Sequence, residues 1–198
     1  MDPDESLSKY IAGARCGLPG FHNIENATAA AGVVLMLMDQ NEASVAHGLE
    51  TFKGVKRRFE YIVRTENAVV IDDYAHHPGE LDAIIGSVRE LYPGKTISGI
   101  FQPHLFTRTR DFADGFAKSL SQLDELILMD IYPARELPIP GITSAWLLEQ
   151  VQNTNKQLLS ENEILQWYKQ RKPEVLLILG AGDIDRLVPK IKATHDGN

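Results

Sequence analysis

Cysteine, long apolar stretches and a signal peptide are missing or nearly missing from this sequence. Its 198 residues include one cysteine, Cys16, so no disulfide can form within the chain, and a disulfide-stabilised secreted domain is excluded. The longest apolar run, residues 32–38, is far shorter than the ~20 residues of a membrane-spanning helix. The first residues are acidic and polar, unlike a signal peptide. We therefore expect a cytoplasmic protein with no membrane partner.

An excess of basic residues is also missing. The chain carries 20 Lys and Arg against 27 Asp and Glu, which gives a formal net charge of −7. Proteins that bind nucleic acid ordinarily present a basic surface, so no nucleic-acid partner is expected. The apolar share of 43% and the charged share of 24% are those of a globular protein. Any anion that this protein binds must therefore meet a local cluster of basic side chains.

Strands and helices alternate along the chain from about residue 52 onward. Apolar residues in 78–91 recur with the spacing of an amphipathic helix. The expected strands are 59–64, 68–72, 95–101, 125–131, 156–159 and 175–179, and the expected helices are 78–91, 109–120, 144–151, 161–169 and one that ends at residue 192. Strands that are apolar on both faces and alternate with helices indicate a mostly parallel sheet covered on both sides. The predicted fold is therefore α/β, Rossmann-like and doubly wound.

Residues 1–51 have a different pattern. Two helices are expected there, at 24–38 and 42–49, and they offer little core of their own. We interpret this segment as a short helical remnant of a larger domain, in front of an α/β domain at 52–198. Asn23 or Asn26 could cap the first helix. The functional alternative is that these amides, with His22, hold a planar base.

Polar side chains follow the expected strand 68–72. Asp72, Asp73, His76 and His77 lie within six residues, directly before a helix. Ligands of such sheets bind at the carboxyl ends of the strands, so these residues are candidates for ribose, metal or substrate contact. The alternative is helix capping in a solvated loop. No third ligand follows at a standard spacing, so a zinc site made by protein ligands alone is not predicted.

A second polar segment follows the strand 95–101. His104, Arg108 and Arg110 lie near the start of a helix, where guanidinium groups suit a carboxylate or a phosphate. The alternative is a surface ion pair between Arg108 and Asp111. The basic run 53–58 precedes the first strand of the domain and is a candidate phosphate contact, although a solvated surface would explain it too.

Two further loops are less informative. Residues 132–141 form a proline-rich loop after the strand 125–131, and its role is open between structure and function. Gly180 and Gly182 follow the last strand but lack the third glycine of the dinucleotide fingerprint. Tight packing between strand and helix explains this glycine pair equally well.

Five motifs, taken together and in this order, resemble the Mur ligase family of amide-forming ligases. They extend from about residue 17 to residue 183, at intervals that fit the family. The motifs are Pro19-Gly20-x-His22-Asn23-x-x-Asn26-Ala27, Gly54-Val55-Lys56-Arg57-Arg58-Phe59-Glu60, Asp72-Asp73-Tyr74-Ala75-His76-His77-Pro78, Phe101-Gln102-Pro103-His104 with Thr107-Arg108-Thr109-Arg110-Asp111, and Asp130-Ile131-Tyr132-Pro133-Ala134.

The resemblance implies an ATP-dependent ligation in peptidoglycan precursor synthesis. It is nearest to the branch of the family that joins L-alanine to UDP-N-acetylmuramate through an acyl phosphate. The family has a UDP-sugar domain, a central ATPase domain and a C-terminal domain that closes over ATP. Residues 52–198 resemble the last of these, and residues 1–51 resemble the tail of the central domain. The family's GxxGKT/S phosphate loop occurs nowhere in this sequence, so we expect the chain alone to be inactive without the N-terminal and central domains.

The resemblance also implies roles for individual residues. His22, Asn23 and Asn26 correspond to adenine contacts, Arg58 to a catalytic contact with the ATP phosphates, and Asp73 to a ribose contact. Mg²⁺ is implied too, with its ligands mostly in the central domain and none predicted in this chain.

The same resemblance places the L-alanine site after two strands. His76 and Arg108 would line it, the guanidinium paired with the substrate carboxylate, and Tyr74, His104 and Arg110 would add to it. His76 is also the candidate to take the proton from the alanine ammonium.

Three other functions remain open on the residues alone. The Rossmann-like alternation with Gly180 and Gly182 would suit a nucleotide-binding oxidoreductase domain. A metal-dependent phosphoesterase could be built on the side chains of Asp72, Asp73, His76 and His77. An interaction module with no active site is the third alternative.

Overall fold

The computed structural model describes residues 11, 13–18, 20–38 and 41–197. The chain divides into two compact units, residues 1–54 and 55–198. No helix among the described residues is both long and apolar enough to span a bilayer.

The first unit is a pair of helices, α1 (Phe21–Leu37) and α2 (Glu42–Thr51). Its small core is formed by Ala31, Leu35 and Val45. Helix α1 begins after Gly20 with no side-chain cap, so the expectation that Asn23 or Asn26 caps it is wrong. Both asparagines lie inside the helix, because the helix starts three residues earlier than the apolar pattern predicted.

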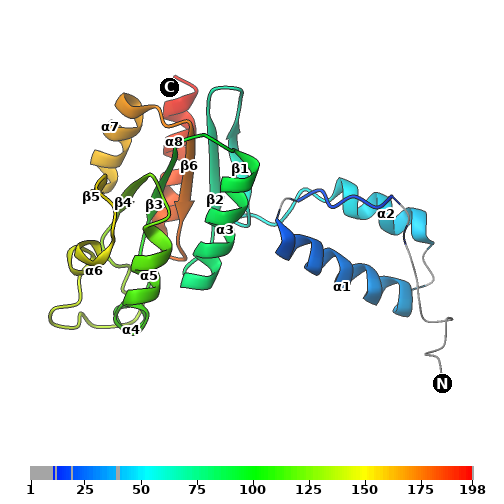
Figure 1. Ribbon diagram of the computed structural model, residues 1–198, viewed down its shortest axis with the longest axis horizontal. Helices are drawn as coiled ribbons and strands as arrows, with labels where there is room; N and C mark the ends of the chain where they lie inside the picture. Colours follow the sequence, from blue (N-terminus) through cyan, green and yellow to red (C-terminus); the bar gives the residue numbers. More distant parts are fainter. Residues whose placement is uncertain (1–10, 12, 19, 39–40, 198) are drawn as a thin grey trace. The chain divides into compact units, whose positions relative to one another are not determined.

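The second unit is built on a six-stranded sheet (Figure 1). Its strand order is β1-β2-β6-β3-β4-β5, with β1 antiparallel to β2 and the other neighbours parallel. The strands are β1 (Glu60–Arg64), β2 (Val69–Asp73), β3 (Ile97–Phe101), β4 (Glu125–Leu128), β5 (Lys156–Leu158) and β6 (Val175–Leu179). The predicted mostly parallel α/β fold is confirmed.

Helices cover both faces of this sheet, as predicted. Their bounds are α3 (Pro78–Leu91), α4 (Phe106–Asp111), α5 (Ala113–Leu120), α6 (Ser144–Gln150), α7 (Glu161–Arg171), the 3₁₀ helix η2 (Asp183–Arg186) and α8 (Leu187–His195). Residues from α3, α5 and α6 share one buried cluster with Ile71 and Phe101. Residues from α7 and α8 share the other with Val70 and Ile100. Neighbouring strand residues thus face opposite layers, as the pleat of a strand requires.

Helix α3 illustrates how the sequence specifies these elements. Leu81, Ile84, Ile85 and Val88 form its buried stripe, and burying each such side chain contributes about 1.5–3 kcal/mol. The helix begins with Pro78 at its first position, preceded by a capping box. Its start is therefore fixed within the chain, directly after the polar segment that follows β2.

Two predicted elements near the end of the sheet differ from the structure. The helix expected at 109–120 is two helices, α4 and α5, separated at Phe112, whose backbone leaves the helical region at φ −117° and ψ 20°. The buried side chains of α5 pack on the sheet, whereas α4 buries only Thr109. The strand expected at 125–131 ends at Leu128, opposite the last residue of β3, Phe101, which leaves no partner strand beyond it.

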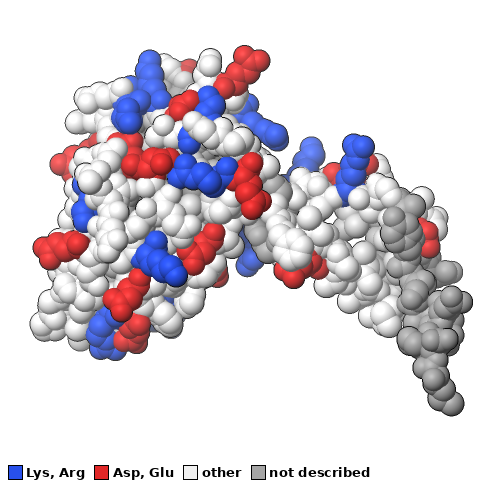
Figure 2. Space-filling view, viewed as in Figure 1, with Lys and Arg blue, Asp and Glu red and all other residues white. Residues whose placement is uncertain are grey.

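Charges are interspersed on the face of the molecule drawn in Figure 2, where basic and acidic side chains lie next to one another. Several basic side chains of the second unit are ion-paired, including Arg89 with Asp124 at 2.8 Å and Lys95 with Glu174 at 2.7 Å. On this face the charge pattern is that of an ordinary solvated surface, with no extended basic patch.

Candidate functional site

Four parallel strands, β2, β6, β3 and β4, deliver their carboxyl ends to one edge of the sheet. The segments that leave this edge are residues 74–77 after β2, 180–182 after β6, 102–108 after β3 and 129–136 after β4. The motifs 72–77 and 104–110, which are separated in sequence by α3 and β3, therefore come to the same edge. This is the edge at which ligands bind in open α/β sheets.

A row of aromatic rings joins three of these segments. The ring centroids of Tyr74 and His76 are 5.2 Å apart, those of His76 and His104 are 6.2 Å apart, and those of His104 and Tyr132 are 5.7 Å apart and stacked. Tyr74 and His76 follow β2, His104 follows β3 and Tyr132 follows β4. Sequence reasoning found the first three of these residues but gave Tyr132 no role of its own.

The orientation of the His76 ring follows from its backbone contact. Its Nδ1 atom lies 2.9 Å from the carbonyl oxygen of Tyr74. Because a carbonyl oxygen only accepts hydrogen bonds, Nδ1 carries the hydrogen, and Nε2 of the neutral ring keeps its lone pair. The backbone N–H groups of His76 and His77 donate to Oε2 of Glu80, at 2.8 and 3.0 Å. The segment before α3 is therefore held at both its side chains and its backbone.

His77 has a structural place rather than one in the ring row. Its Nδ1 accepts from the N–H of Gly79 at 3.4 Å and so caps α3. Its ring packs against Phe112, with centroids 4.6 Å apart. The structure thus agrees with the alternative interpretation of His77, that it caps a helix.

His104 is held by Arg108, one helical turn later. Nη1 of Arg108 lies 3.4 Å from Nδ1 of His104. A guanidinium only donates, so Nδ1 accepts and Nε2 of His104 carries the hydrogen. Burial, followed by the charges of Arg108 and His76, lowers the pKa of His104. At neutral pH His104 is therefore an uncharged N–H donor beside a fixed cation, an arrangement that suits a carboxylate.

The start of α4, which carries Arg108, is fixed by the loop after β4. Leu105 precedes the helix with φ 72° and supplies no side-chain cap. Instead, Oε2 of Glu136 accepts from the backbone N–H of Thr107 at 3.0 Å, and Oε1 accepts from the Thr107 hydroxyl. These hydrogen bonds lower the pKa of Glu136. The proline-rich loop thus supplies the cap that the helix lacks, which gives it a holding role beside the site.

The two aspartates at the end of β2 differ in their surroundings. Both oxygens of Asp73 accept backbone N–H groups, of Phe59 and of Ala75, each at 2.8 Å. Asp72 is 2% exposed, and its Oδ2 lies 3.6 Å from Nε of Arg57. Burial raises the pKa of Asp72 to about 6, and the charge of Arg57 opposes that rise.

The predicted cluster at the end of β2, made by Asp72, Asp73, His76 and His77, does not assemble as a metal centre. Among the residues that the structure describes, no three His, Cys, Asp or Glu side chains lie close enough to hold a metal ion. Asp72 faces an arginine, Asp73 the backbone, and His77 the start of a helix. The geometry therefore gives no support to the phosphoesterase alternative.

The remaining predicted residues lie outside the ring row. Arg58 is exposed on the segment before β1. Arg110 is exposed and pairs with Asp111 at 2.7 Å, so the ion pair on α4 joins Asp111 to Arg110 rather than to Arg108. Asn23 and Asn26 lie on α1 of the first unit, and the side chain of His22 is outside the described residues.

The glycine pair after β6 is explained by close packing. A Cβ atom on Gly182 would meet the amide oxygen of Gln102 and would lie 2.7 Å from Cβ of Tyr132. The Gln102 amide donates to Asp183 at 2.9 Å and accepts from the N–H of Ile184 at 3.0 Å. Gln102, which belongs to one of the five family motifs but was given no role there, therefore joins the segments after β3 and β6.

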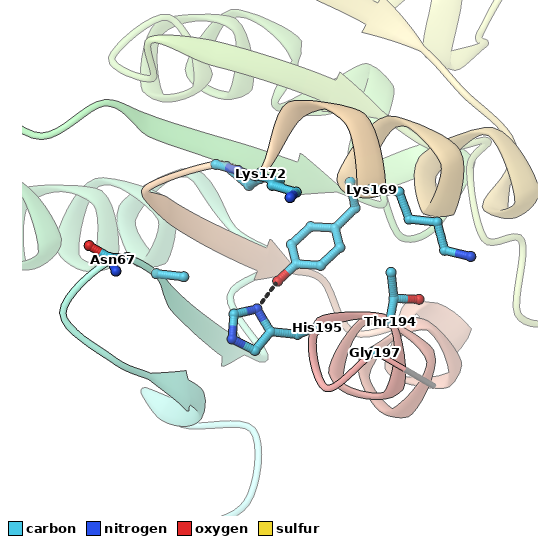
Figure 3. Close-up of a pocket in the computed structure, with 9 residues that line it drawn as sticks. Asn67, Lys169, Lys172, Thr194, His195 and Gly197 are labelled. Carbon is cyan, nitrogen blue, oxygen red and sulfur yellow. Dashed lines mark hydrogen bonds between the residues drawn. The ribbon is translucent and has the colours of Figure 1, made fainter.

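A cavity of about 590 Å³ lies at the opposite, amino edge of the sheet (Figure 3). None of the predicted site residues lines it. Its walls include Lys169 and Lys172 at the end of α7, and Thr194 and His195 at the end of α8, with Tyr168 hydrogen-bonded to His195 at 3.1 Å. Basic residues at helix ends complement the negative C-terminal ends of helices, which accounts for the lysines without a ligand. We therefore keep the carboxyl edge as the candidate site.

Comparison with known families shows which family this chain belongs to. A family model described as "Mur ligase, glutamate ligase domain" matches residues 57–182, more than half of the chain. The chain belongs to the Mur ligase family. The match begins at Arg57 and ends at Gly182, so it contains all four strand-end segments of the candidate site. The oxidoreductase and phosphoesterase alternatives are set aside on this ground.

Curated relatives of this Mur ligase chain share about half of its sequence. The UDP-N-acetylmuramate–L-alanine ligase of Flavobacterium psychrophilum is 51% identical over 189 residues, which cover 96% of this chain and 42% of that protein. The enzyme of the same name from Porphyromonas gingivalis strain W83 is 54% identical over 183 residues, 92% of this chain and 40% of that protein. The chain spans about two fifths of the length of these relatives.

Solved structures confirm the Mur ligase fold. The UDP-N-acetylmuramate-alanine ligase of Thermotoga maritima is 26% identical with a TM-score of 0.70, over 92% of this chain and 39% of that chain. A murein peptide ligase of Psychrobacter arcticus, 20% identical with a TM-score of 0.60, covers 90% of this chain and 38% of its own. At 20% identity, the similarity to the second structure supports only the fold.

Proposed function

We propose that this chain is the C-terminal part of a cytoplasmic, ATP-dependent ligase that joins L-alanine to UDP-N-acetylmuramate in peptidoglycan precursor synthesis. The observation that supports it most is the meeting of His76, His104 and Arg108 at one sheet edge, in a chain about half identical to ligases with that name. In the proposed reaction ATP phosphorylates the lactyl carboxylate. The alanine nitrogen then attacks the acyl carbon, and phosphate leaves.

The groups at this edge match the two ends of an amino acid. A carboxylate requires a cation and N–H donors, which Arg108 and Nε2–H of His104 supply. An ammonium must lose a proton before its nitrogen can attack, and Nε2 of neutral His76 has the lone pair that could take it. Tyr74 and Tyr132 stand at the two ends of the ring row, next to His76 and His104 respectively, and would flank the bound amino acid.

The residues proposed to contact ATP are Arg58 and Asp73 in the second unit and His22, Asn23 and Asn26 in the first. Arg58 is exposed, so its guanidinium is accessible to the phosphates, where a fixed positive charge would stabilise developing negative charge. The carboxylate of Asp73 accepts the backbone N–H groups of Phe59 and Ala75, which fixes it at the end of β2, and we propose that it contacts the ribose hydroxyls. His22, Asn23 and Asn26 would hold the adenine.

Mg²⁺ would be held outside this chain. The described residues contain no cluster of three possible ligand side chains, so the oxygen ligands that Mg²⁺ prefers would come from the central domain and the ATP phosphates. The ion would neutralise charge on the phosphates, and the residues of this chain would bind and orient the amino acid.

The first unit supports a further part of this proposal, that residues 1–51 are the tail of a central ATPase domain. Phe21, Met36 and Leu37 on α1 are 73%, 75% and 80% exposed. Among the described residues of this helix pair the buried core is small, and large apolar side chains lie in water, at a cost of roughly 25 cal/mol for each Å². The remainder of a central domain would cover that surface.

A domain exchange tests the proposed function. The matching C-terminal part of the Porphyromonas gingivalis ligase is replaced by this chain, and phosphate release is measured with ATP, UDP-N-acetylmuramate and L-alanine. We expect release that depends on all three substrates, and none from this chain alone. Arg108→Met in the exchanged enzyme should raise the KM for L-alanine at least tenfold, whereas Arg110→Met, the matched control on the same helix, should change it less.

Two results would contradict the proposal. The first is phosphate release by the isolated chain, which would show that it needs no central domain. The second is an exchanged enzyme that is folded by circular dichroism and binds ATP but releases no phosphate with L-alanine, while releasing it with another amino acid.

A further inference from the structure

Arg57 lies beside Arg58 in the same basic run, but the two side chains have different surroundings. Arg58 is exposed, whereas the side chain of Arg57 is only 14% exposed. Arg57 has φ 60°, in the left-handed region, which is unfavourable for a residue with a side chain. Its N–H donates to Glu60 and its carbonyl accepts from the N–H of Tyr74, both at 2.8 Å. These bonds hold the backbone that turns the guanidinium inward.

The Arg57 guanidinium contacts the segments that follow two neighbouring strands. Nη2 donates to the carbonyl oxygen of Gly180, after β6, at 2.5 Å. Cζ lies 5.0 Å from the centroid of the Tyr74 ring, after β2, as a cation–π contact. The ring of Tyr74 in turn meets the ring of His76 edge-on. One planar group therefore sets the distance between the loop after β6 and the first ring of the row.

The Arg57 guanidinium also lies near two carboxylates, the buried one of Asp72 and the half-exposed one of Asp185. Nε lies 3.6 Å from Oδ2 of Asp72, and Nη1 lies 3.8 Å from Oδ2 of Asp185. Nε of Arg57 and Oδ1 of Asp72 are both buried without a hydrogen-bond partner among the described residues. A buried carboxylate without a nearby cation is strongly destabilising. The attraction of Asp72 therefore keeps the Arg57 side chain in this position. If the guanidinium moved away from Tyr74 and Gly180 into the solvent, the Asp72 carboxylate would be left buried without a cation.

We propose that Arg57 is a positioning residue, which fixes Tyr74 against the segment after β6 and thereby places the His76 ring opposite His104. The inference rests on the proposed function for its catalytic consequence, and on the contacts of this chain alone for its structural part. Arg57 acts on the amino-acid end of the site, unlike Arg58, for which the proposed contact is the ATP phosphates.

The structural part is tested in this chain by NMR. Arg57→Met keeps the length of the side chain and removes the guanidinium. We expect the Tyr74 and Gly180 amide signals to shift and the nuclear Overhauser contacts between the Tyr74 and His76 rings to be lost. The control is Arg64→Met, because Arg64 makes the same kind of contact, 4.5 Å over the Tyr61 ring, on strand β1. It should leave these signals in place.

The catalytic part is tested in the exchanged enzyme. Arg57→Met should raise the KM for L-alanine about tenfold and leave the KM for ATP within twofold. A residue needed only for folding would instead lower the apparent kcat and leave both KM values unchanged. If Arg57→Met does not fold, Arg57→Lys decides, because it keeps the charge toward Asp72 but has no planar group to bridge Gly180 and Tyr74. It should show the same rise in KM.

The outcomes separate the two proposals. Unchanged Tyr74–His76 ring contacts in Arg57→Met, or in a folded Arg57→Lys, would overturn the positioning role whatever the activity. A KM for L-alanine unaffected by either substitution would overturn it too. If the unsubstituted exchanged enzyme folds and binds ATP but releases phosphate only with an amino acid other than L-alanine, the proposed function fails. The NMR comparison with Arg64→Met still decides whether Arg57 holds the rings.

Discussion

Nη1 of Arg108 lies 3.4 Å from Nδ1 of His104, so the cation proposed to bind the substrate carboxylate also fixes the ring beside it. The pKa of His104 is lowered by burial and then by the charge of Arg108. Because a nearby positive charge disfavours the imidazolium, its removal must move this pKa upward. The contact therefore makes a prediction that needs no substrate.

We expect Arg108→Met to raise the pKa of His104 in this chain, with burial still holding it below the usual value. The measurement is an NMR titration of the His104 ring. Arg110→Met is the matched control, because Arg110 lies on the same helix but is exposed and paired with Asp111. A His104 titration curve identical in Arg108→Met and the unsubstituted chain would show that the two side chains do not interact in solution.

Glu136 offers a test of the loop after β4. Its carboxylate accepts both the backbone N–H and the hydroxyl of Thr107 at the start of α4. Glu136→Gln keeps the shape but removes the charge that strengthens these hydrogen bonds. We expect faster hydrogen exchange at the Thr107 amide and, in the exchanged enzyme, a higher KM for L-alanine, because Arg108 is on the same short helix. Glu149→Gln, at the exposed side of α6, serves as control; equal Thr107 exchange in both variants would contradict the capping role.

Much of the fold could be predicted because apolar patterning determined it. Strand β6 and helix α3 have the predicted bounds, since the first is apolar throughout and the second has a clear stripe and a proline start. The break at Phe112 could not be predicted in the same way. Residues 109–120 contain no proline to mark a break, and it is α5 alone whose apolar side chains join the core cluster of the sheet.

Site residues that directly follow apolar strands could be predicted from the sequence. Residues that the backbone conformation distinguishes from identical neighbours could not. His76, His104 and Arg108 follow apolar strands, and the parallel topology brings them together. Arg57 and Arg58 are identical in type and adjacent, so only the backbone at φ 60° decides which one turns inward. Tyr132 joins the row through stacking on His104, a contact for which the sequence holds no local signal.

Gly182 allows a test of the close packing beneath the site. A methyl group there would meet the Gln102 amide and lie 2.7 Å from Cβ of Tyr132, so these side chains must move. We expect Gly182→Ala to lower the free energy of unfolding by about 1–3 kcal/mol. Gly86→Ala is the control, because its methyl group would meet nothing within 4 Å on α3. It should be neutral or stabilising by up to about 1 kcal/mol. Equal urea midpoints for the two variants would contradict the packing.

The burial of Asp72 predicts how the free energy of unfolding depends on pH. Its pKa in the folded chain is raised by burial from 3.8 to about 6, so the folded state binds this proton more tightly than the unfolded state. The associated stability is fully present below pH 3.8 and is lost as the pH rises through 6, by an amount on the order of 2–3 kcal/mol. Asp72→Asn cannot ionise, so its free energy of unfolding, relative to the unsubstituted chain, should increase from pH 4 to pH 7 in urea titrations. Asp114→Asn, at an exposed site on α5, measures the effect of removing a surface carboxylate. If the difference between Asp72→Asn and the unsubstituted chain stayed constant over this range, Asp72 would titrate alike in the folded and unfolded states, and its burial against Arg57 would carry no electrostatic cost.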